Sequence, residues 1–284
     1  MERVRAALAA HIPSCQPVVI TKFGSGIDNV VFLVNGELIL RASNENDAKR
    51  RADEVRREAE LLHMVAEISP LQVPRPIFVD ADHGVLAYRK LAGVPLNHFE
   101  LLNPASLGPV LGEFLGNLHL APTADIATLV PCEDEPLTAW REEADENYRQ
   151  VADRVPSEAR PLVQDFLDRP PPAAAGTLVF CHNDLGAEHL LFDPEMETLT
   201  GVIDWTDAAI TDPAVDFGRL YRDFGPAALK AIVANYRAPW TGGTYERAVF
   251  FARCALLEDL AYGIHGADRR YADAALAHLM RTFT

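Results

Sequence analysis

The reactive side chains of this sequence are most concentrated between residues 180 and 207. Asp184 and His189 lie in the first part of this stretch, and Asp204 lies near its end. Each acid comes after an apolar run that is typical of a β-strand, so we expect Asp184 and Asp204 on loops at strand ends. A rigid sheet can hold an exposed reactive group at such a position, which suits catalysis.

Two kinds of chemistry fit these residue types. A carboxylate close to a hydroxyl can act as a general base, and a bound Mg²⁺ needs one or two oxygen ligands with positions left open for phosphates. Asp184 suits the first role, and Asp204 with the side chain of residue 189 suits the second.

Two other interpretations of the same residues are weaker. A metallohydrolase with His182, Asp184, His189 and Asp204 as metal ligands is disfavoured, because two histidines seven residues apart across a loop match no common zinc spacing. Taken alone, the tripeptide from His182 to Asp184 is more often ordinary turn chemistry than an active site.

The elements that must position these groups fall into two parts. The first third of the chain begins with a short amphipathic helix over its first ten residues. Asn35 and Gly36 predict a two-residue hairpin turn. Further elements are predicted from alternating and helical apolar patterns: strands over Val18–Phe23, Val30–Val34, Glu37–Arg41, Val73–Asp80 and Val85–Leu91, and a helix from Asp47 to Ala66. We therefore expect a five-stranded small lobe that ends near residue 92.

The remainder of the chain is predicted to be mostly helical. Helices are expected over residues 105–120, 136–153, 157–168, 213–222, 226–236, 244–263 and 268–282. Short β-rich segments over Leu178–Phe180, Leu190–Phe192 and Thr200–Ile203 interrupt them. Asp212 followed by Pro213 is a favourable helix start, with a carboxylate cap and a proline in the first turn.

Composition places the chain among soluble globular proteins. It has 284 residues, 49% of them apolar and 24% charged, and no apolar run approaches the roughly 20 residues that a bilayer requires. The four cysteines are scattered, which disfavours a zinc knuckle or a disulfide framework and favours a reducing compartment. We therefore expect a cytoplasmic protein.

The formal net charge of −15 disfavours nucleic acid and anionic membranes as partners. Residues 1–99 hold 12 acids and 12 bases, so their net charge is zero. The other residues hold 29 acids and 14 bases and would attract a cation.

Four linked motifs over about 35 residues resemble the catalytic segment of the aminoglycoside phosphotransferase family. They are His182-Asn183-Asp184 followed by His189, then Ile203-Asp204-Trp205, then Asp212-Pro213, then Asp216. The similarity extends from near residue 17 to the last helices. It implies an α+β, two-lobe, protein-kinase-like fold, with a nucleotide-binding lobe over residues 1–92 and a helical lobe over residues 93–284.

The resemblance implies a role for each catalytic-segment residue. Asp184 would be the catalytic base, His189 and Asp204 would hold Mg²⁺, and Asp216 would brace the catalytic loop at a helix start. Many family members have Asn where this chain has His189. The His form is similar to the aminoglycoside 2''-phosphotransferases and the macrolide 2'-phosphotransferases, although imidazole is an unusual ligand for Mg²⁺.

The resemblance also implies a site for ATP or GTP in the first lobe. Gly24, Ser25 and Gly26 would cover the phosphates, although the third glycine of the kinase loop is absent. Arg41 stands where the family has a phosphate-binding Lys, and Glu58 is its expected partner on the following helix. The remaining nucleotide contacts are expected from Val31, Tyr88, Leu91 and Ile203.

Asp216 follows Asp204 by only twelve positions. That leaves no room for the activation loop with which a protein kinase orders a peptide, so we expect a small-molecule acceptor. The acidic second lobe favours a cationic acceptor, such as an antibiotic that is phosphorylated in resistance. Candidate acceptor contacts are Glu258 and Asp259 on a late helix, with Asp207 and Asp268 as further options. Nothing in the sequence indicates a coiled-coil seam, and we expect a monomer.

Three alternatives remain open at this point. A macrolide 2'-phosphotransferase would need a wider apolar cleft, which Phe250, Phe251 and Tyr262 could supply. A kinase for choline, homoserine or a sugar would share the fold. A pseudokinase-like binding module is disfavoured, because a binder has no need of Asp184, His189 and Asp204 together.

Overall fold

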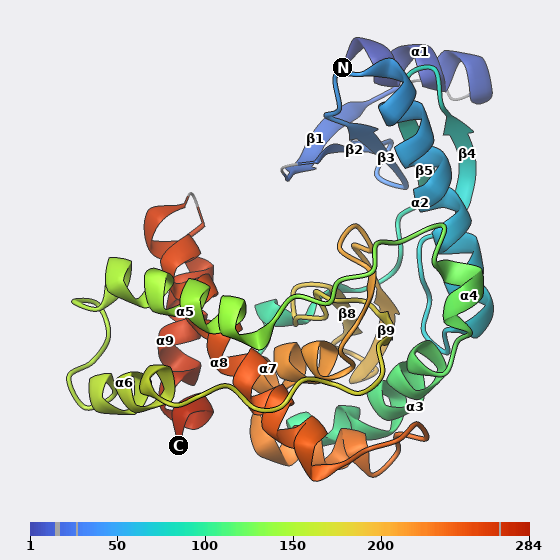
Figure 1. Cartoon of the computed structure of the whole chain (residues 1–284). Helices are drawn as coiled ribbons and strands as arrows, with labels where there is room; N and C mark the ends of the chain where they lie inside the picture. The colour runs from blue at the N-terminus through green and yellow to red at the C-terminus, as the bar shows by residue number, and fades with distance from the viewer. Residues whose placement is uncertain (15–17, 27, 267) are drawn as a thin grey trace. The chain divides into compact units, whose positions relative to one another are not determined.

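The chain forms two compact units in the computed structural model, which describes residues 1–14, 18–26, 28–266 and 268–284 (Figure 1). Unit 1 comprises Met1–Val94 and Leu191–Thr206, and unit 2 comprises Pro95–Leu190 and Asp207–Thr284. Within the described ranges, no helix is both long enough and apolar enough to cross a membrane. The cysteines at 132, 181 and 254 are free thiols, and Cys15 lies outside the described residues.

The division between the units differs from the expected lobes in one respect. The first boundary falls two residues after the expected one, but residues 191–206 belong to unit 1 although the motif analysis placed them in the second lobe. Two hydrogen bonds from residues 200 and 202 to residues 92 and 72 explain this grouping. The Val202 N–H donates to the Gln72 carbonyl at 2.8 Å, and Thr200 Oγ1 donates to the Ala92 carbonyl at 2.7 Å.

Unit 1 is built on an antiparallel five-stranded sheet of order β1-β2-β3-β5-β4. A second sheet has the order β6-β8-β9, and all of it except Pro95 and Leu190 belongs to unit 1. The elements are α1 (Glu2–His11), β1 (Ile20–Ser25), β2 (Asn29–Val34), β3 (Leu38–Ser43), α2 (Ala48–Ile68), β4 (Pro76–Asp80), β5 (Val85–Arg89), β6 (Val94–Pro95), β8 (Leu190–Asp193) and β9 (Thr198–Val202).

The alternation of side chains along the strands separates the core from the candidate nucleotide residues. Phe32, Leu40 and Ala87 are buried in a cluster with Val4 and Leu8 of α1. Because successive strand residues point to opposite faces, Val31, Arg41 and Tyr88 lie on the other face of the sheet. In the strand register, Val31 is directly opposite Arg41.

The predicted hairpin turn is confirmed. Asn35 and Gly36 have φ angles of 51° and 77°, and the Glu37 N–H donates to the Val34 carbonyl at 3.1 Å. The next strand starts at Leu38, one residue later than predicted. The strand predicted from Val73 starts only at Pro76, because Gln72 bridges Gly201 in β9 instead of extending β4.

Unit 2 is mostly helical. Two short strands, β7 and β10, pair antiparallel beneath the candidate site. The elements are η1 (Leu96–His98), η2 (Pro104–Leu107), α3 (Gly108–His119), α4 (Thr123–Ile126), α5 (Leu137–Val151), α6 (Arg160–Asp168), β7 (Val179–Cys181), β10 (Ala209–Thr211), α7 (Ala214–Val233), α8 (Gly242–His265) and α9 (Arg270–Phe283).

The two helices predicted over 213–222 and 226–236 correspond to α7. Its backbone leaves the helical conformation at Gly225, where φ is 79°, and resumes at Pro226. The strand β10 and the helix α4 were not predicted, because three or four residues are too few to show a period.

Aromatic side chains form much of the core of α5, α6, α8 and α9. The Phe166 ring packs against Phe250 and Phe283, and the Trp140 ring packs edge-on against Phe251 at 5.1 Å between centroids. Phe250 and Phe251 are each only 4% exposed. They therefore build the helical core and leave little exposed aromatic surface for the open apolar cleft that the macrolide alternative requires.

Candidate active site

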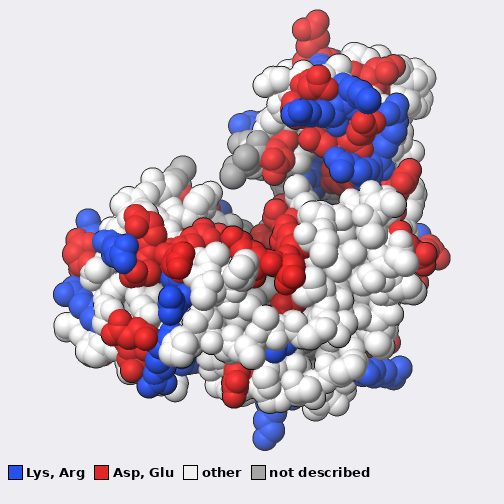
Figure 2. Space-filling model, viewed as in Figure 1, with Lys and Arg blue, Asp and Glu red and all other residues white. Residues whose placement is uncertain are grey.

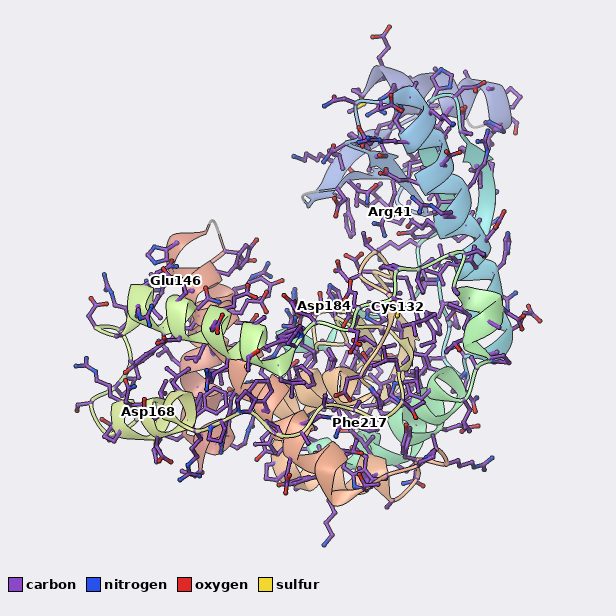
Figure 3. The ribbon with its side chains drawn as sticks, in the orientation of Figure 1. Arg41, Cys132, Glu146, Asp168, Asp184 and Phe217 are labelled. Carbon is purple, nitrogen blue, oxygen red and sulfur yellow. The ribbon has the colours of Figure 1, made fainter. Side chains whose placement is uncertain are left out.

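The candidate catalytic loop connects β7 to β8, and its central acid is Asp184, which Figure 3 labels. The preceding residue, Asn183, has a φ of 70°, in the left-handed region that Asn tolerates better than most side chains. Asn183 Nδ2 donates to Glu133 Oε2 at 2.9 Å and to the Asp207 carbonyl at 3.0 Å. The loop is therefore held in a strained but well-supported conformation.

Asp216, in the first turn of α7, holds the start of this loop. Its carboxylate accepts hydrogen bonds from the backbone N–H groups of His182 and Asn183, at 3.0 and 2.8 Å. Its Oδ2 also lies 3.1 Å from His119 Nε2, and His119 Nδ1 lies 2.8 Å from the Tyr236 hydroxyl. The side chains of Asp216 and His119 are both fully buried, so the network is a rigid support.

The next turns of α7 hold the rest of the loop. Arg219 Nε lies 3.6 Å from Asp184 Oδ1. One turn further along, Arg222 Nη2 lies 3.4 Å from Glu188 Oε1, and Asp223 accepts the Ala187 N–H at 2.7 Å. Residues three or four apart share a helix face, so one face of α7 contacts the loop in sequence from residue 182 to residue 188.

The Asp184 carboxylate is flanked by a cation or imidazole at each oxygen. Arg219 faces Oδ1, and His189 Nδ1 lies 3.5 Å from Oδ2. Burial by itself raises the pKa of Asp184, but Arg219 and His189 outweigh it and hold that pKa below its ordinary value. Asp184 is therefore ionised at neutral pH, as a group that accepts a proton must be.

His189 has a defined tautomer when it is neutral. Its Nδ1 lies 2.7 Å from the backbone carbonyl of Asp184, and a carbonyl can only accept, so Nδ1 carries the proton. The lone pair is then on Nε2. A backbone carbonyl that fixes one ring nitrogen is typical of histidines that bind metals through the other.

In unit 1, Arg41 of β3, labelled in Figure 3, is the centre of the candidate donor site. Its Nη1 lies 3.1 Å from Glu58 Oε1 and 3.4 Å from Asp204 Oδ1, and its Nη2 donates to Thr206 Oγ1 at 2.6 Å. Thr206 Oγ1 in turn donates to Asp204 Oδ1 at 2.9 Å. Asp204 has a φ of 62°, so these contacts stabilise an uncommon backbone conformation.

Burial raises the pKa of Glu58 more than the opposite charge of Arg41 lowers it. Tyr88 is 9% exposed, and burial raises its pKa to about 12. Tyr88, Arg41 and Glu58 thus form one buried polar group. Leu91 follows β5 and Ile203 follows β9, and both are half-buried.

The expected phosphate loop is shorter than predicted, because Gly24 and Ser25 are the last residues of β1 and of the three only Gly26 lies in the turn to β2. The Gly26 N–H donates to the Asn29 carbonyl at 2.9 Å, which closes the turn. A side chain added at Gly24 or Gly26 would meet no neighbouring atom, so a bound group could approach the backbone closely here. Ser25 pairs with Val30 through its backbone, but its side chain and the whole of Ile27 lie outside the described residues.

The possible ligand atoms of the two units fit a divalent cation unequally. Asp204 offers a hard carboxylate whose side chain is 46% exposed, which suits Mg²⁺. In unit 2, ligand atoms of Asp184, Glu188 and His189 all lie within 4.8 Å of one another. His189 contributes an imidazole nitrogen, which suits Mn²⁺ better than Mg²⁺.

The four expected acceptor contacts differ in availability. Glu258 is 47% exposed and pairs with Arg219 at 3.3 Å, whereas Asp259 is 16% exposed and pairs with Arg222 at 2.8 Å. Burial raises the pKa of Asp259 to about 7. Asp268 pairs with Arg270 at 2.6 Å, and Asp207 is exposed. Asp259 therefore belongs to a buried ion cluster rather than to an open surface.

Sequence reasoning missed two features beside the catalytic loop. The first is Arg219, which the spacing of three residues from Asp216 could have indicated. The second is a cavity of about 280 Å³ in unit 2. Its only signal in the sequence is a run of three acids, residues 133–135. The walls of the cavity include Glu133, Asp134, Glu135, Trp140, Asp212 and Phe251. The hydrogen bond from Asn183 to Glu133 joins this cavity to the loop.

The fold and the catalytic loop together define a protein of the kinase-like class, and comparisons with known proteins identify its family. Residues 19–251 match the model of the phosphotransferase enzyme family. The chain belongs to this family and is a phosphotransferase. The α+β, kinase-like fold expected from the motifs is confirmed.

The individual proteins that this chain resembles share a quarter or less of its residues. Viomycin phosphotransferase of Streptomyces vinaceus is 25% identical over 239 residues, which is 76% of this chain and 79% of that protein. A solved GDP complex of aminoglycoside 2'-phosphotransferase-IIIa is 22% identical with a TM-score of 0.72, over 99% of this chain and 98% of that one. A macrolide 2'-phosphotransferase from Brachybacterium faecium is 23% identical with a TM-score of 0.62, over 98% of both chains.

Proposed function

We propose that this phosphotransferase moves the γ-phosphoryl group of ATP or GTP to a hydroxyl of a small cationic antibiotic, and so confers resistance to it. The observation that carries the proposal is the state of Asp184. It is an ionised carboxylate, with Arg219 near one oxygen and His189 near the other, on a loop that one face of α7 supports over its length.

In the proposed reaction, Asp184 orients the acceptor hydroxyl and takes its proton. The hydroxyl oxygen bonds to the γ-phosphorus, the bond from that phosphorus to the β–γ bridging oxygen breaks, and the nucleoside diphosphate leaves. Such transition states are loose, so catalysis depends mainly on positioning and on charge neutralisation. A base that is already ionised and fixed meets the positioning requirement.

The phosphoryl donor, ATP or GTP, would be bound by residues of unit 1. The open backbone at Gly24 and Gly26 would cover the phosphates, and the planar guanidinium of Arg41 would contact their oxygens. Val31, Leu91 and Ile203 would contact the purine. Asp204 and His189 would hold Mg²⁺, which neutralises charge on the phosphates when bound.

Charge supports a cationic acceptor. Unit 2 holds 25 acids and 14 bases, whereas unit 1 holds 16 and 12. Figure 2 shows acidic side chains gathered over the face of unit 2 that includes α5. The cavity of about 280 Å³ combines a rim of Glu133, Asp134 and Glu135 with an aromatic wall, which suits an amine-bearing molecule.

The relatives point in the same direction. The curated relative is named for viomycin, and one solved neighbour, 21% identical with a TM-score of 0.71, is described as a GDP and kanamycin complex. A macrolide acceptor is less favoured, because a wide apolar cleft needs exposed aromatic surface. Phe250 and Phe251 are each only 4% exposed, although Phe251 reaches the wall of the acid-rimmed cavity, and Tyr262 is 57% exposed.

The test is steady-state turnover with ATP and GTP separately against kanamycin, viomycin, a macrolide and choline. Asp184→Asn should lower acceptor-dependent kcat at least about 1,000-fold while nucleotide affinity stays within about twofold, because the base acts in the chemical step. Activity that survives this change would exclude Asp184 as the base.

Asp204→Asn should instead weaken Mg-nucleotide binding at least about tenfold, because the carboxylate charge toward the metal is lost. Titration of a fluorescent nucleotide with and without Mg²⁺ measures this. An unchanged effect of Mg²⁺ on affinity would remove Asp204 from the metal site.

A further inference from the structure

Among the described residues, Arg219 is a charged group that contacts the proposed base but has no role in the proposed mechanism. Its side chain is 13% exposed. The guanidinium lies between two carboxylates on different elements, with Nε 3.6 Å from Asp184 Oδ1 and Nη1 3.3 Å from Glu258 Oε2. It therefore links the candidate catalytic loop to α8.

The shape of the guanidinium is suited to this position. Its donors lie in a fixed plane, so an Arg that is held by one carboxylate presents the remaining donors to a second in a defined direction. A carboxylate that is contacted at one oxygen only can turn about its Cβ–Cγ bond. With Arg219 at Oδ1 and His189 at Oδ2, Asp184 has a preferred orientation.

The neighbouring Arg222 shows what a purely structural arginine looks like here. It is 4% exposed and is surrounded by acids: Glu188, Asp223 and Asp259. Those contacts hold the loop backbone and α8 in place. Arg219, one helical turn earlier, contacts the reacting side chain itself and an acid that is 47% exposed.

We propose that Arg219 is a positioning residue that orients the Asp184 carboxylate toward the acceptor hydroxyl. Through Glu258, Arg219 makes this orientation depend on the positive charge of the bound acceptor. This inference rests on the proposed function. A cationic group of the acceptor that pairs with Glu258 weakens the hold of Glu258 on Arg219. Arg219 then pairs more closely with Asp184, so a cationic acceptor improves the orientation of its own base.

Kinetics of four variants test the proposal, with the acceptor that gives the highest turnover among kanamycin, viomycin and a macrolide. Arg219→Met should lower kcat about 100-fold with nucleotide affinity within about twofold, because the misaligned base slows only the chemical step. Arg219→Lys should recover about tenfold of that loss, since Lys keeps the charge without the planar fork. Glu258→Gln should leave kcat within about twofold of the parent, because Arg219 is then released to pair with Asp184, but it should raise the acceptor KM.

Arg149→Met is the matched control, because Arg149 is 66% exposed on α5 and pairs only with acids of its own helix among the contacts described. Its kcat should equal that of the parent protein. Melting temperature is measured for every variant. If Arg219→Met does not fold, Arg219→Lys alone should still show a kcat about tenfold below the parent at a melting temperature within a few degrees of it.

Two results would overturn the proposal. One is a kcat within twofold of the parent in Arg219→Met or in a folded Arg219→Lys. The other is an equal loss of kcat in Arg219→Met and Arg219→Lys together with weakened nucleotide binding, because that result would indicate a structural role for Arg219. Failure of the proposed function is distinguishable, because Asp184→Asn would then retain its turnover whatever Arg219 does.

Discussion

Asp184, His189 and Asp204 differ in how far their residue types alone determine their chemistry. A carboxylate flanked by Arg219 and an imidazole stays ionised, so the environment of Asp184 suits a base. His189 is the least expected of the three as a ligand for Mg²⁺, because its available atom is a nitrogen. The hydrogen bond from Nδ1 to the Asp184 carbonyl places the lone pair of the neutral ring on Nε2, which is the atom that would bind the proposed metal.

At the residue scale, this predicts a change of metal preference in His189→Asn. The amide supplies an oxygen ligand, so the ratio of activity with Mg²⁺ to activity with Mn²⁺ should rise about three- to tenfold. Turnover is measured as a function of each metal at saturating nucleotide. An unchanged ratio would mean that residue 189 does not bind the metal.

At the scale of elements, the sequence predicts the site better than its support. The order of motifs placed Asp184 and Asp204 on loops at strand ends, and both lie there. The spacing of Arg219 from Asp216 indicates a shared helix face. The contacts of that face with the loop could not be predicted, because they depend on how a helix packs against a segment some thirty residues earlier. The same applies to Asp259, whose place in the Arg222 cluster depends on the packing of α7 on α8.

The helix α1 was predicted from its amphipathic pattern, but its attachment to the sheet depends on a buried acid. Asp80 of β4 is 7% exposed; it accepts the His83 N–H at 3.0 Å, and His11 Nε2 of α1 lies 3.3 Å from it. Burial alone would raise the pKa of Asp80, but the hydrogen bonds of His83 and the charge of His11 outweigh it and hold this pKa below its ordinary value.

At the element scale, we therefore expect acid-sensitive stability in unit 1. A folded-state pKa below the unfolded one gives stabilisation that is complete above the unfolded pKa of about 3.9 and is lost as pH falls through the folded value. Asp80→Asn should lower stability by about 1–3 kcal/mol at pH 7 and by less below pH about 4. Thermal melts across this range measure it, with Asp82→Asn, at an exposed position, as control. An equal deficit at every pH would contradict the assignment.

At the scale of the whole molecule, the negative charge is distributed unevenly. Unit 2 has a net charge of −11 and unit 1 of −4, counted from their acids and bases. The neutral first third of the sequence and the acidic remainder already indicated this. The sequence could not show that residues 191–206, with Asp204, group with unit 1, because that depends on the pairing of Val202 with Gln72.

This distribution predicts that salt weakens the binding of a cationic acceptor. Between about 0.1 M and about 1 M salt the Debye length falls from about 10 Å to about 3 Å, so attraction from acids beyond direct contact is screened. The KM for a polyamine antibiotic should rise at least about threefold, while the KM for a neutral alcohol acceptor, if one is used, should change little. Equal responses of the two KM values would argue against an acidic acceptor surface.

Mass spectrometry of the acceptor after incubation with ATP or GTP, Mg²⁺ and the protein tests whether a phosphoryl group is transferred to an antibiotic. Kanamycin, viomycin and a macrolide are each incubated with the parent protein and with Asp184→Asn. We predict that a cationic antibiotic gains one phosphoryl group in step with release of nucleoside diphosphate, and that Asp184→Asn forms no such product. Nucleoside diphosphate released with every acceptor left unmodified, or equal product from Asp184→Asn, would contradict the account.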